Sequence, residues 1–218
     1  MKHFILAAGI FAFVATSCNN EKKESATDTP ATDSVVAKDS GTAQVTAPPM
    51  DSAAMMKAWM DFAKPGAMHQ WMAKLNGKWE ADVTSYSNPA QPEKSKAIAV
   101  YSSALNGLYQ EGKMTGKMMG MPFEGRSITG YDNSKKQFVS TWIDNMGSGI
   151  VFMKGTYDEP SKTLTLKGVQ TDPTTGKDAD IREVMKITDD NNYTLEMYGT
   201  GMDGKEMKFM EAVYKRKK

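Results

Sequence analysis

From residue 77 onward, apolar and polar residues follow one another in short runs of strand length. Leu164 and Leu166 stand one residue apart between polar neighbours, which is the alternation of a strand with one buried face. Nine groups of turn residues separate these runs, so the sequence predicts ten strands. The turns are Ser87-Asn88-Pro89, Asn106-Gly107, Gly120-Met121-Pro122, Asp132-Asn133-Ser134, Asn145-Met146-Gly147, Asp158-Glu159-Pro160, Asp172-Pro173, Asp189 to Asn192, and Asp203-Gly204.

This spacing leaves no room for a crossover helix between strands, so consecutive strands are expected to pair antiparallel in chain order. Closing such a meander removes its exposed edges. We therefore predict an all-β, ten-stranded antiparallel up-and-down barrel over residues 77–218. Ten strands leave an interior wide enough for side chains and a cavity. A β-sandwich is the alternative architecture.

Residues 50–76 carry a helical period instead. Met55, Trp59 and Phe62 recur at i, i+4 and i+7, after Asp51 or Ser52 as a helix cap and before a stop at Pro65-Gly66. A second short helix is predicted to place four apolar side chains on one face: Met68, Trp71, Met72 and Leu75. We expect both short helices to pack on the barrel.

The N-terminus has the three parts of a lipoprotein signal. Lys2 is basic, Phe4 to Val14 is an almost unbroken apolar run, and Ala15-Thr16-Ser17 leads to Cys18. The apolar run is too short to span a bilayer as a mature helix. We predict that residues 1–17 are removed and that a lipid on Cys18 holds the protein on the outer membrane of a Gram-negative, Bacteroidota-like bacterium, on the periplasmic side or the cell surface. An ordinary secreted protein with a free cysteine is the alternative.

Residues 18–49 are predicted to form a disordered tether, because the stretch has no aromatic residue and is rich in Ser, Thr, Ala, Asp, Lys and Pro. Cys18 is the one cysteine of the chain, so a lipidated protein has no thiol for disulfides, redox chemistry or metal binding. Without Lys2 the 27 basic residues become 26, against 26 acidic ones. This neutral balance argues against a nucleic-acid partner.

The first predicted strand opens on Gly77-Lys78-Trp79, and Arg216 lies near the end of the last. This combination resembles the lipocalin and calycin superfamily. The resemblance implies that Arg216 lies across Trp79 at the closed end of the barrel, as a structural cation–π contact.

Longer stretches resemble the bacterial domain-of-unknown-function family 1579, which looks like a calycin-type barrel. The GYD and STWID blocks within Ser127 to Gly149 are the most specific, and the likeness covers most of residues 66–216. The other matching stretches are Met68 to Trp79, Gly155 to Leu166 and Met210 to Arg216. The resemblance supports the fold and implies no catalytic residues.

Strand parity outlines a candidate ligand pocket. Glu183 shares parity with Ile181 and Met185, so a carboxylate is expected to point inward and to need a partner. Arg182 and Arg126 are the candidate partners. The residues predicted to form a pocket for an amphipathic ligand are Arg126, Trp142, Asp144, Glu183, Tyr193, Tyr198 and Glu211. A structural ion-pair network, or carboxylates at a solvated rim, is the alternative.

Other chemistries have weaker support. Four of the 18 methionines cluster around one predicted hairpin, and thioethers bind Cu(I), but methionine also fills cores. His69 is the one histidine after the signal, so a haem site or a Ser-His-Asp triad would have to use it. It sits on the second predicted helix, however, and no serine lies in a G-x-S-x-G context. We predict no cofactor and no metal. The methionines are Met114, Met118, Met119 and Met121.

The expected function is noncatalytic binding or carriage of a small apolar or amphipathic molecule. One alternative is a fully packed envelope module with a protein partner. The least favoured is an enzyme that uses the inward carboxylates Glu183 and Glu211.

Overall fold

The computed structural model describes residues 51–201 and 203–218. The expected signal peptide, the lipid on Cys18 and the tether lie outside these residues. Within them, no helix combines the length and the apolar character that crossing a membrane requires.

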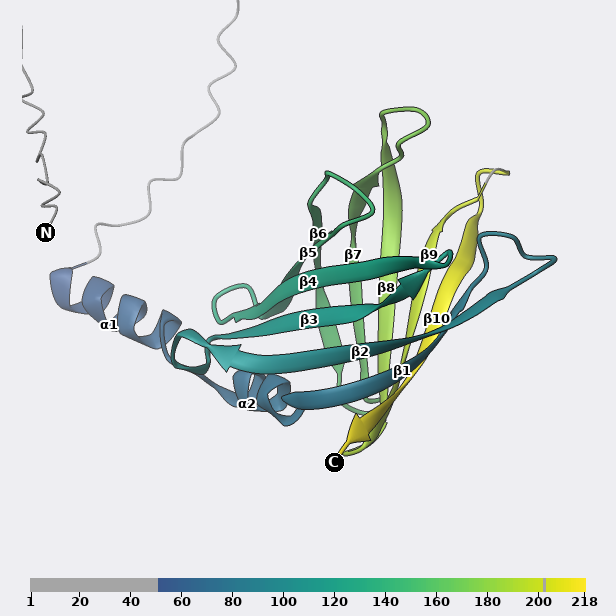
Figure 1. Ribbon diagram of the computed structural model, residues 1–218. Helices are drawn as coiled ribbons and strands as arrows, with labels where there is room; N and C mark the ends of the chain where they lie inside the picture. Colours follow the sequence, from purple (N-terminus) through teal and green to yellow (C-terminus); the bar gives the residue numbers. More distant parts are fainter. Residues whose placement is uncertain (1–50, 202) are drawn as a thin grey trace, which may run out of the picture. The chain divides into compact units, whose positions relative to one another are not determined.

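The described chain forms ten strands that close into one antiparallel barrel, each strand paired with its neighbours in sequence and β1 paired with β10 (Figure 1). The all-β barrel prediction is confirmed, and closure rules out the sandwich. The strands are β1 Gly77–Ser85, β2 Glu93–Ala104, β3 Tyr109–Met118, β4 Met121–Asp132, β5 Gln137–Asp144, β6 Val151–Asp158, β7 Thr163–Thr171, β8 Asp178–Asp189, β9 Asn192–Thr200 and β10 Glu206–Lys217, with a short 3-10 helix η1 at Leu105–Gly107.

Alternation places the apolar members of each strand inside the barrel. Leu164 and Leu166 of β7 are buried, and the polar residues between and beside them face outward or lie half-buried. The core also takes Ala81, Phe138 and Ile181 from other strands. In the part of the chain that the structure describes, all strand pairings and this core lie within residues 68–217, and Pro48–Lys218 form a compact unit of their own.

Helix α2, Ala67–Lys74, covers one end of the barrel. Its Met72 is buried in the core, and its Trp71 packs against Phe138 with the ring centroids 5.2 Å apart. Gln110 of β3 donates a hydrogen bond of 2.6 Å to the Met72 carbonyl. His69 accepts a hydrogen bond of 3.0 Å from the backbone N–H of Gly66. These contacts make α2 the cap of that end.

Trp79 and Arg216 join this cap to the strands. The Arg216 guanidinium lies 4.2 Å from the Trp79 ring centroid. Its Nη1 donates to the Asn76 carbonyl at 2.6 Å, and its Nη2 donates to the Lys74 carbonyl at 2.6 Å. The indole N–H of Trp79 donates to the Leu75 carbonyl at 2.8 Å. The closed end is therefore fixed by one aromatic ring and one cation.

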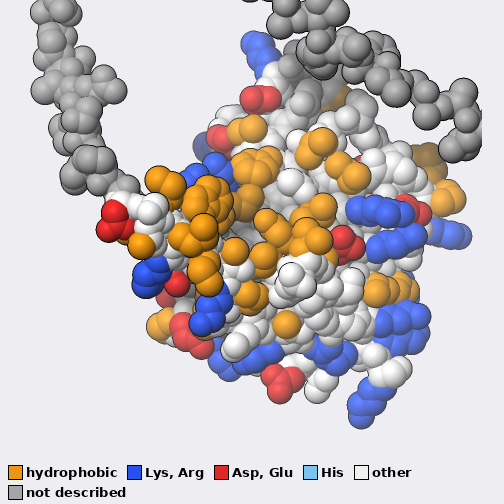
Figure 2. Space-filling view, turned by 90° about the vertical axis from the view of Figure 1, so that its left-hand side faces the viewer, with side chains coloured by type: hydrophobic (Ala, Val, Ile, Leu, Met, Phe, Trp, Pro, Cys, Tyr) orange, Lys and Arg blue, Asp and Glu red, His pale blue; other side chains and the backbone are white. Residues whose placement is uncertain are grey.

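Helix α1, Ser52–Phe62, begins at the side-chain cap of Asp51 and has no buried residue. We predicted that this helix packs on the barrel. None of its side chains is buried, but its C-terminal end contacts the β4–β5 turn, where the Asn133 side-chain amide donates to the Phe62 and Lys64 carbonyls at 2.9 and 2.8 Å. Figure 2 shows hydrophobic side chains gathered on the face of the molecule that carries α1. The large exposed apolar residues of α1 are Met55, Met56, Trp59, Met60 and Phe62.

Candidate ligand-binding cavity

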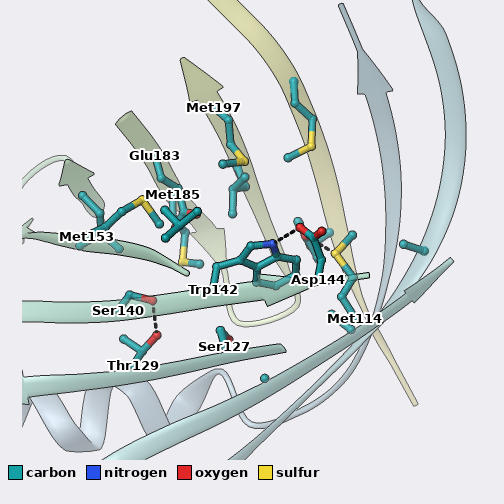
Figure 3. A pocket seen from close by; sticks show the side chains of 18 of the residues that line it. Met114, Ser127, Thr129, Ser140, Trp142, Asp144, Met153, Glu183, Met185 and Met197 are labelled. Carbon is teal, nitrogen blue, oxygen red and sulfur yellow. Dashed lines mark hydrogen bonds between the residues drawn. The ribbon is translucent and has the colours of Figure 1, made fainter. Parts of the chain in front are cut away.

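The barrel encloses a cavity of about 270 Å³ (Figure 3). Strands from all around the barrel contribute to its wall. The end of the cavity that α2 covers is lined by Trp71, Met72 and Leu75. Much of the wall consists of thioether and branched apolar side chains. These include Met114, Met153, Met185, Met197, Leu164, Leu166 and Ile181.

Glu183 of β8 contributes a half-buried carboxyl group to this wall, and this group has no hydrogen-bond or ion-pair partner among the described residues. Its register neighbours are Leu166 on β7 and Met197 on β9, and Met185 lies beside it in Figure 3. Burial raises the pKa of Glu183 from 4.5 to about 7, and no hydrogen bond or cation of the described chain counteracts this. Near neutral pH the cavity therefore holds a carboxyl group poised between its two protonation states.

Three tyrosines lie in the neighbourhood of this carboxyl group. The hydroxyls of Tyr101 and Tyr193 are 3.1 Å apart, and the Tyr193 and Tyr214 rings stack at 4.3 Å. Burial raises the pKa of Tyr101 to about 12, and the negative charge of Glu183 adds to the rise. Burial and then nearby charges, including that of Glu183, also raise the pKa of Tyr193 and Tyr214. These phenols consequently remain neutral and offer hydroxyl groups.

Trp142 and Asp144 of β5 form a second polar point of the wall. The indole N–H of Trp142 donates to the Asp144 carboxylate at 2.7 Å, and the Met146 backbone N–H donates to its other oxygen at 2.9 Å. The ring of Trp142 lies over Gly125 of β4, where any Cβ would collide with it. The wall thus needs glycine at residue 125, and Asp144 already has donors within the protein.

A third polar region consists of hydroxyl groups on β4 and β5. The Thr129 and Ser140 hydroxyls are 2.9 Å apart, and Ser127 lies next to them along β4 (Figure 3). Since hydroxyls both donate and accept, this side of the cavity adapts to either kind of polar ligand atom.

The sequence profile of the family described as Protein of unknown function (DUF1579) matches residues 64–216, which is well over half of the chain. The chain belongs to this family. No curated protein gives a significant match to it.

The solved structures that resemble this DUF1579 barrel include the following two. The crystal structure of Rv2717c from M. tuberculosis has a TM-score of 0.56 and 12% sequence identity, and the match covers 71% of this chain and 100% of that one. The S-type phycobiliprotein lyase CPES from Guillardia theta has a TM-score of 0.51 and 10% identity, covering 70% of this chain and 94% of that one. At these identities the likeness establishes the fold alone.

Of the residues that strand parity assigned to the pocket of the DUF1579 protein, the cavity wall contains Trp142, Asp144 and Glu183. Tyr193 lies behind the wall, with 1% of its surface exposed, and reaches the site through its contact with Tyr101.

Arg126 lies on the outside of the barrel instead. It pairs with Glu124 at 3.2 Å, and its strand neighbour Ile128 is 52% exposed. As predicted, Arg126 and Ile128 lie on the same face of β4. Because the Ile128 side chain is exposed, this face is the outer one. Arg182 also faces outward, where it pairs with Glu206 at 2.6 Å. Neither arginine reaches Glu183.

Glu211 and Tyr198 likewise do not line the cavity. A register shift between Lys208 and Met210 reverses the facing of β10, so that Phe209 and Met210 both line the cavity and Glu211 points away from it. Glu211 pairs with Lys208 at 2.6 Å, which holds the pKa of Glu211 below its ordinary value. The Tyr198 hydroxyl donates to Glu196 at 2.8 Å on the same outer face. No carboxylate pair of Glu183 with Glu211 exists.

The methionine cluster is divided between two environments. Met114 and Met118 line the cavity, whereas Met119 and Met121 at the tip of the β3–β4 hairpin are 61% and 48% exposed. His69 is buried and its Nδ1 is occupied by the Gly66 N–H. Burial lowers the pKa of His69, as expected for a packed side chain.

Several wall residues were not identified from the sequence. Ser127, Thr129 and Ser140 face inward among apolar neighbours, which contradicts the simple rule that polar residues face out. One usable signal was the glycine at residue 125, because a glycine inside a strand indicates the close approach of another group.

Proposed function

We propose that this DUF1579 protein binds and carries a small apolar or amphipathic molecule inside its barrel. The observation that carries the proposal is the cavity of about 270 Å³ with its mostly apolar wall. This volume is close to the lower end of small-molecule pockets, which span about 300–1,000 Å³. A fully packed barrel, as required by the alternative of a purely structural module, would have no such space.

The similar fold of a protein named as a phycobiliprotein lyase transfers no reaction to this chain at 10% identity. Within the described residues, the arrangement that paired carboxylates would need is lost because Glu211 faces outward. The remaining polar groups of the wall suit recognition, since Asp144 is already held by two donors. Binding without catalysis is therefore the function that the geometry favours.

Native mass spectrometry of the full chain, taken from its own host in a detergent of known mass, tests the proposal. We expect a reproducible extra mass that is released on unfolding. In a Met197→Trp variant, whose larger side chain fills the cavity, we expect the affinity for this ligand to fall by about tenfold or more, which is about 1.4 kcal/mol or more of binding energy.

Val169→Trp provides the matched control, because Val169 is 44% exposed on the outer face of β7. This variant should keep the extra mass at the wild-type level. A clean protein mass in the wild type, or equal loss of ligand from both variants, would argue against the cavity as a carrier site.

We further propose that a lipid on Cys18 holds the protein on the outer membrane. The basic Lys2, the apolar run from Phe4 to Val14 and the small residues before Cys18 support this. Metabolic labelling with radioactive palmitate should mark the wild-type protein and leave Cys18→Ala unlabelled. Label that persists in the variant would contradict lipid attachment at this residue.

A further inference from the structure

The charges that face the cavity are unequal. Glu183 contributes a half-buried carboxyl group that makes no hydrogen bond or ion pair with a described residue, and its strand neighbours are Leu166 and Met197. Asp144 is the other acid of the wall, and its oxygens already accept hydrogen bonds from the protein.

No described lysine or arginine balances this carboxyl group inside the barrel. Of the two lysines that contribute to the wall, Lys113 has its amine 3.2 Å from Glu124 on the outer face, and Lys117 is exposed. The nearest arginine in the strand, Arg182, is engaged by Glu206 outside. The interior therefore contains an acid without its counter-charge.

An ionised carboxyl group that is partly withdrawn from water and has no partner is costly, and a cation or an N–H donor that reaches it lowers that cost. A carboxylate-bearing ligand would face the opposite situation, because two like charges in one cavity repel. The polar group that Glu183 selects is thus a nitrogen with hydrogens to donate.

From this arrangement we infer that the ligand of the barrel is an amphipathic amine, whose apolar body lies among Met153, Met185 and Met197 and whose nitrogen pairs with Glu183; this rests on the proposed carrier function. At about 30 Å³ per water molecule, the cavity has room for roughly nine waters, or for a ligand of about a dozen non-hydrogen atoms. Fatty acids are disfavoured by the same charge.

Three probes of equal chain length test the inference by calorimetric titration of the segment 51–218 at pH 8: octylamine, octan-1-ol and octanoate. We expect octylamine to bind about tenfold more tightly than octan-1-ol, the value of a charge-assisted hydrogen bond, and octanoate to bind most weakly. In Glu183→Gln the ratio of amine to alcohol affinity should fall to about one.

Glu111→Gln makes the same chemical change on the outer face of β3, where Glu111 is exposed, and should keep the wild-type ratio. Circular dichroism verifies folding, and Glu183→Met, which copies the neighbouring thioethers, serves as a second variant if the glutamine variant is unfolded. If octan-1-ol binds but octylamine binds no more tightly, or octanoate binds best, the inference is overturned while the carrier function stands. If none of the three probes binds, both are overturned.

Discussion

Trp79→Ala is expected to lower the free energy of unfolding by about 4 kcal/mol, as is typical when a fully buried tryptophan is truncated. Trp79 is 1% exposed and contacts Tyr193 with ring centroids 4.8 Å apart. Its loss also leaves the Leu75 carbonyl without its donor and the Arg216 guanidinium without the ring that it covers. Thermal unfolding should shift down by about 8–16 °C in a protein of this size.

Trp59→Ala is the matched control, since Trp59 is 65% exposed on α1. Its effect should stay within about 0.5 kcal/mol, as for most surface substitutions. Equal destabilisation by the two variants would contradict the assignment of barrel closure to Trp79. Chemical denaturation of both variants beside the wild type supplies the comparison.

Glu183 is expected to make the barrel less stable as the pH rises. The folded protein binds the proton of this carboxyl group more tightly than the unfolded chain does, because the pKa is about 7 in the barrel against an ordinary 4.5. The stabilisation is complete below about pH 4.5 and is lost as the pH rises through about 7. At about 1.4 kcal/mol for each pKa unit, the loss amounts to about 3 kcal/mol.

Glu183→Gln removes this dependence and should exceed the wild type in stability at pH 8 while matching it at pH 4. Denaturation at both pH values measures the difference. His69, whose pKa burial lowers, changes stability in the opposite direction with pH, but it does so equally in both proteins and cancels in the comparison. Glu111→Gln should follow the wild type. A Glu183→Gln curve parallel to that of the wild type would show that folding does not raise the pKa of this carboxyl group.

The barrel was predictable because its signals are local. Turn residues at regular intervals and the alternation in Leu164 and Leu166 each depend on a few neighbouring residues, and the strands form where they indicate. The pairing of Trp79 with Arg216 has no local cause, and only the likeness to lipocalin-type barrels suggested it.

The candidate site was less accessible to such reasoning, since parity tells which residues share a face and leaves open which face is inside. For β8 the apolar residues identified the inner face, and Glu183 lies on that face. For β4 the exposed Ile128 was misleading, and Arg126 proved to lie outside. In β10 the register shift reversed the facing of Glu211, an effect of strand pairing that no pattern within the strand reveals.

By itself, the sequence determined the number and order of the strands, because hydrogen-bonded turns and one-sided burial act over a few residues. The tertiary structure alone decided that the interior is hollow, that α1 remains uncovered while α2 closes the barrel, and that no lysine or arginine among residues 51–201 and 203–218 pairs with Glu183. Each of these depends on which distant side chains meet across the barrel. Such meetings follow from strand register and closure, and these are properties of the whole fold.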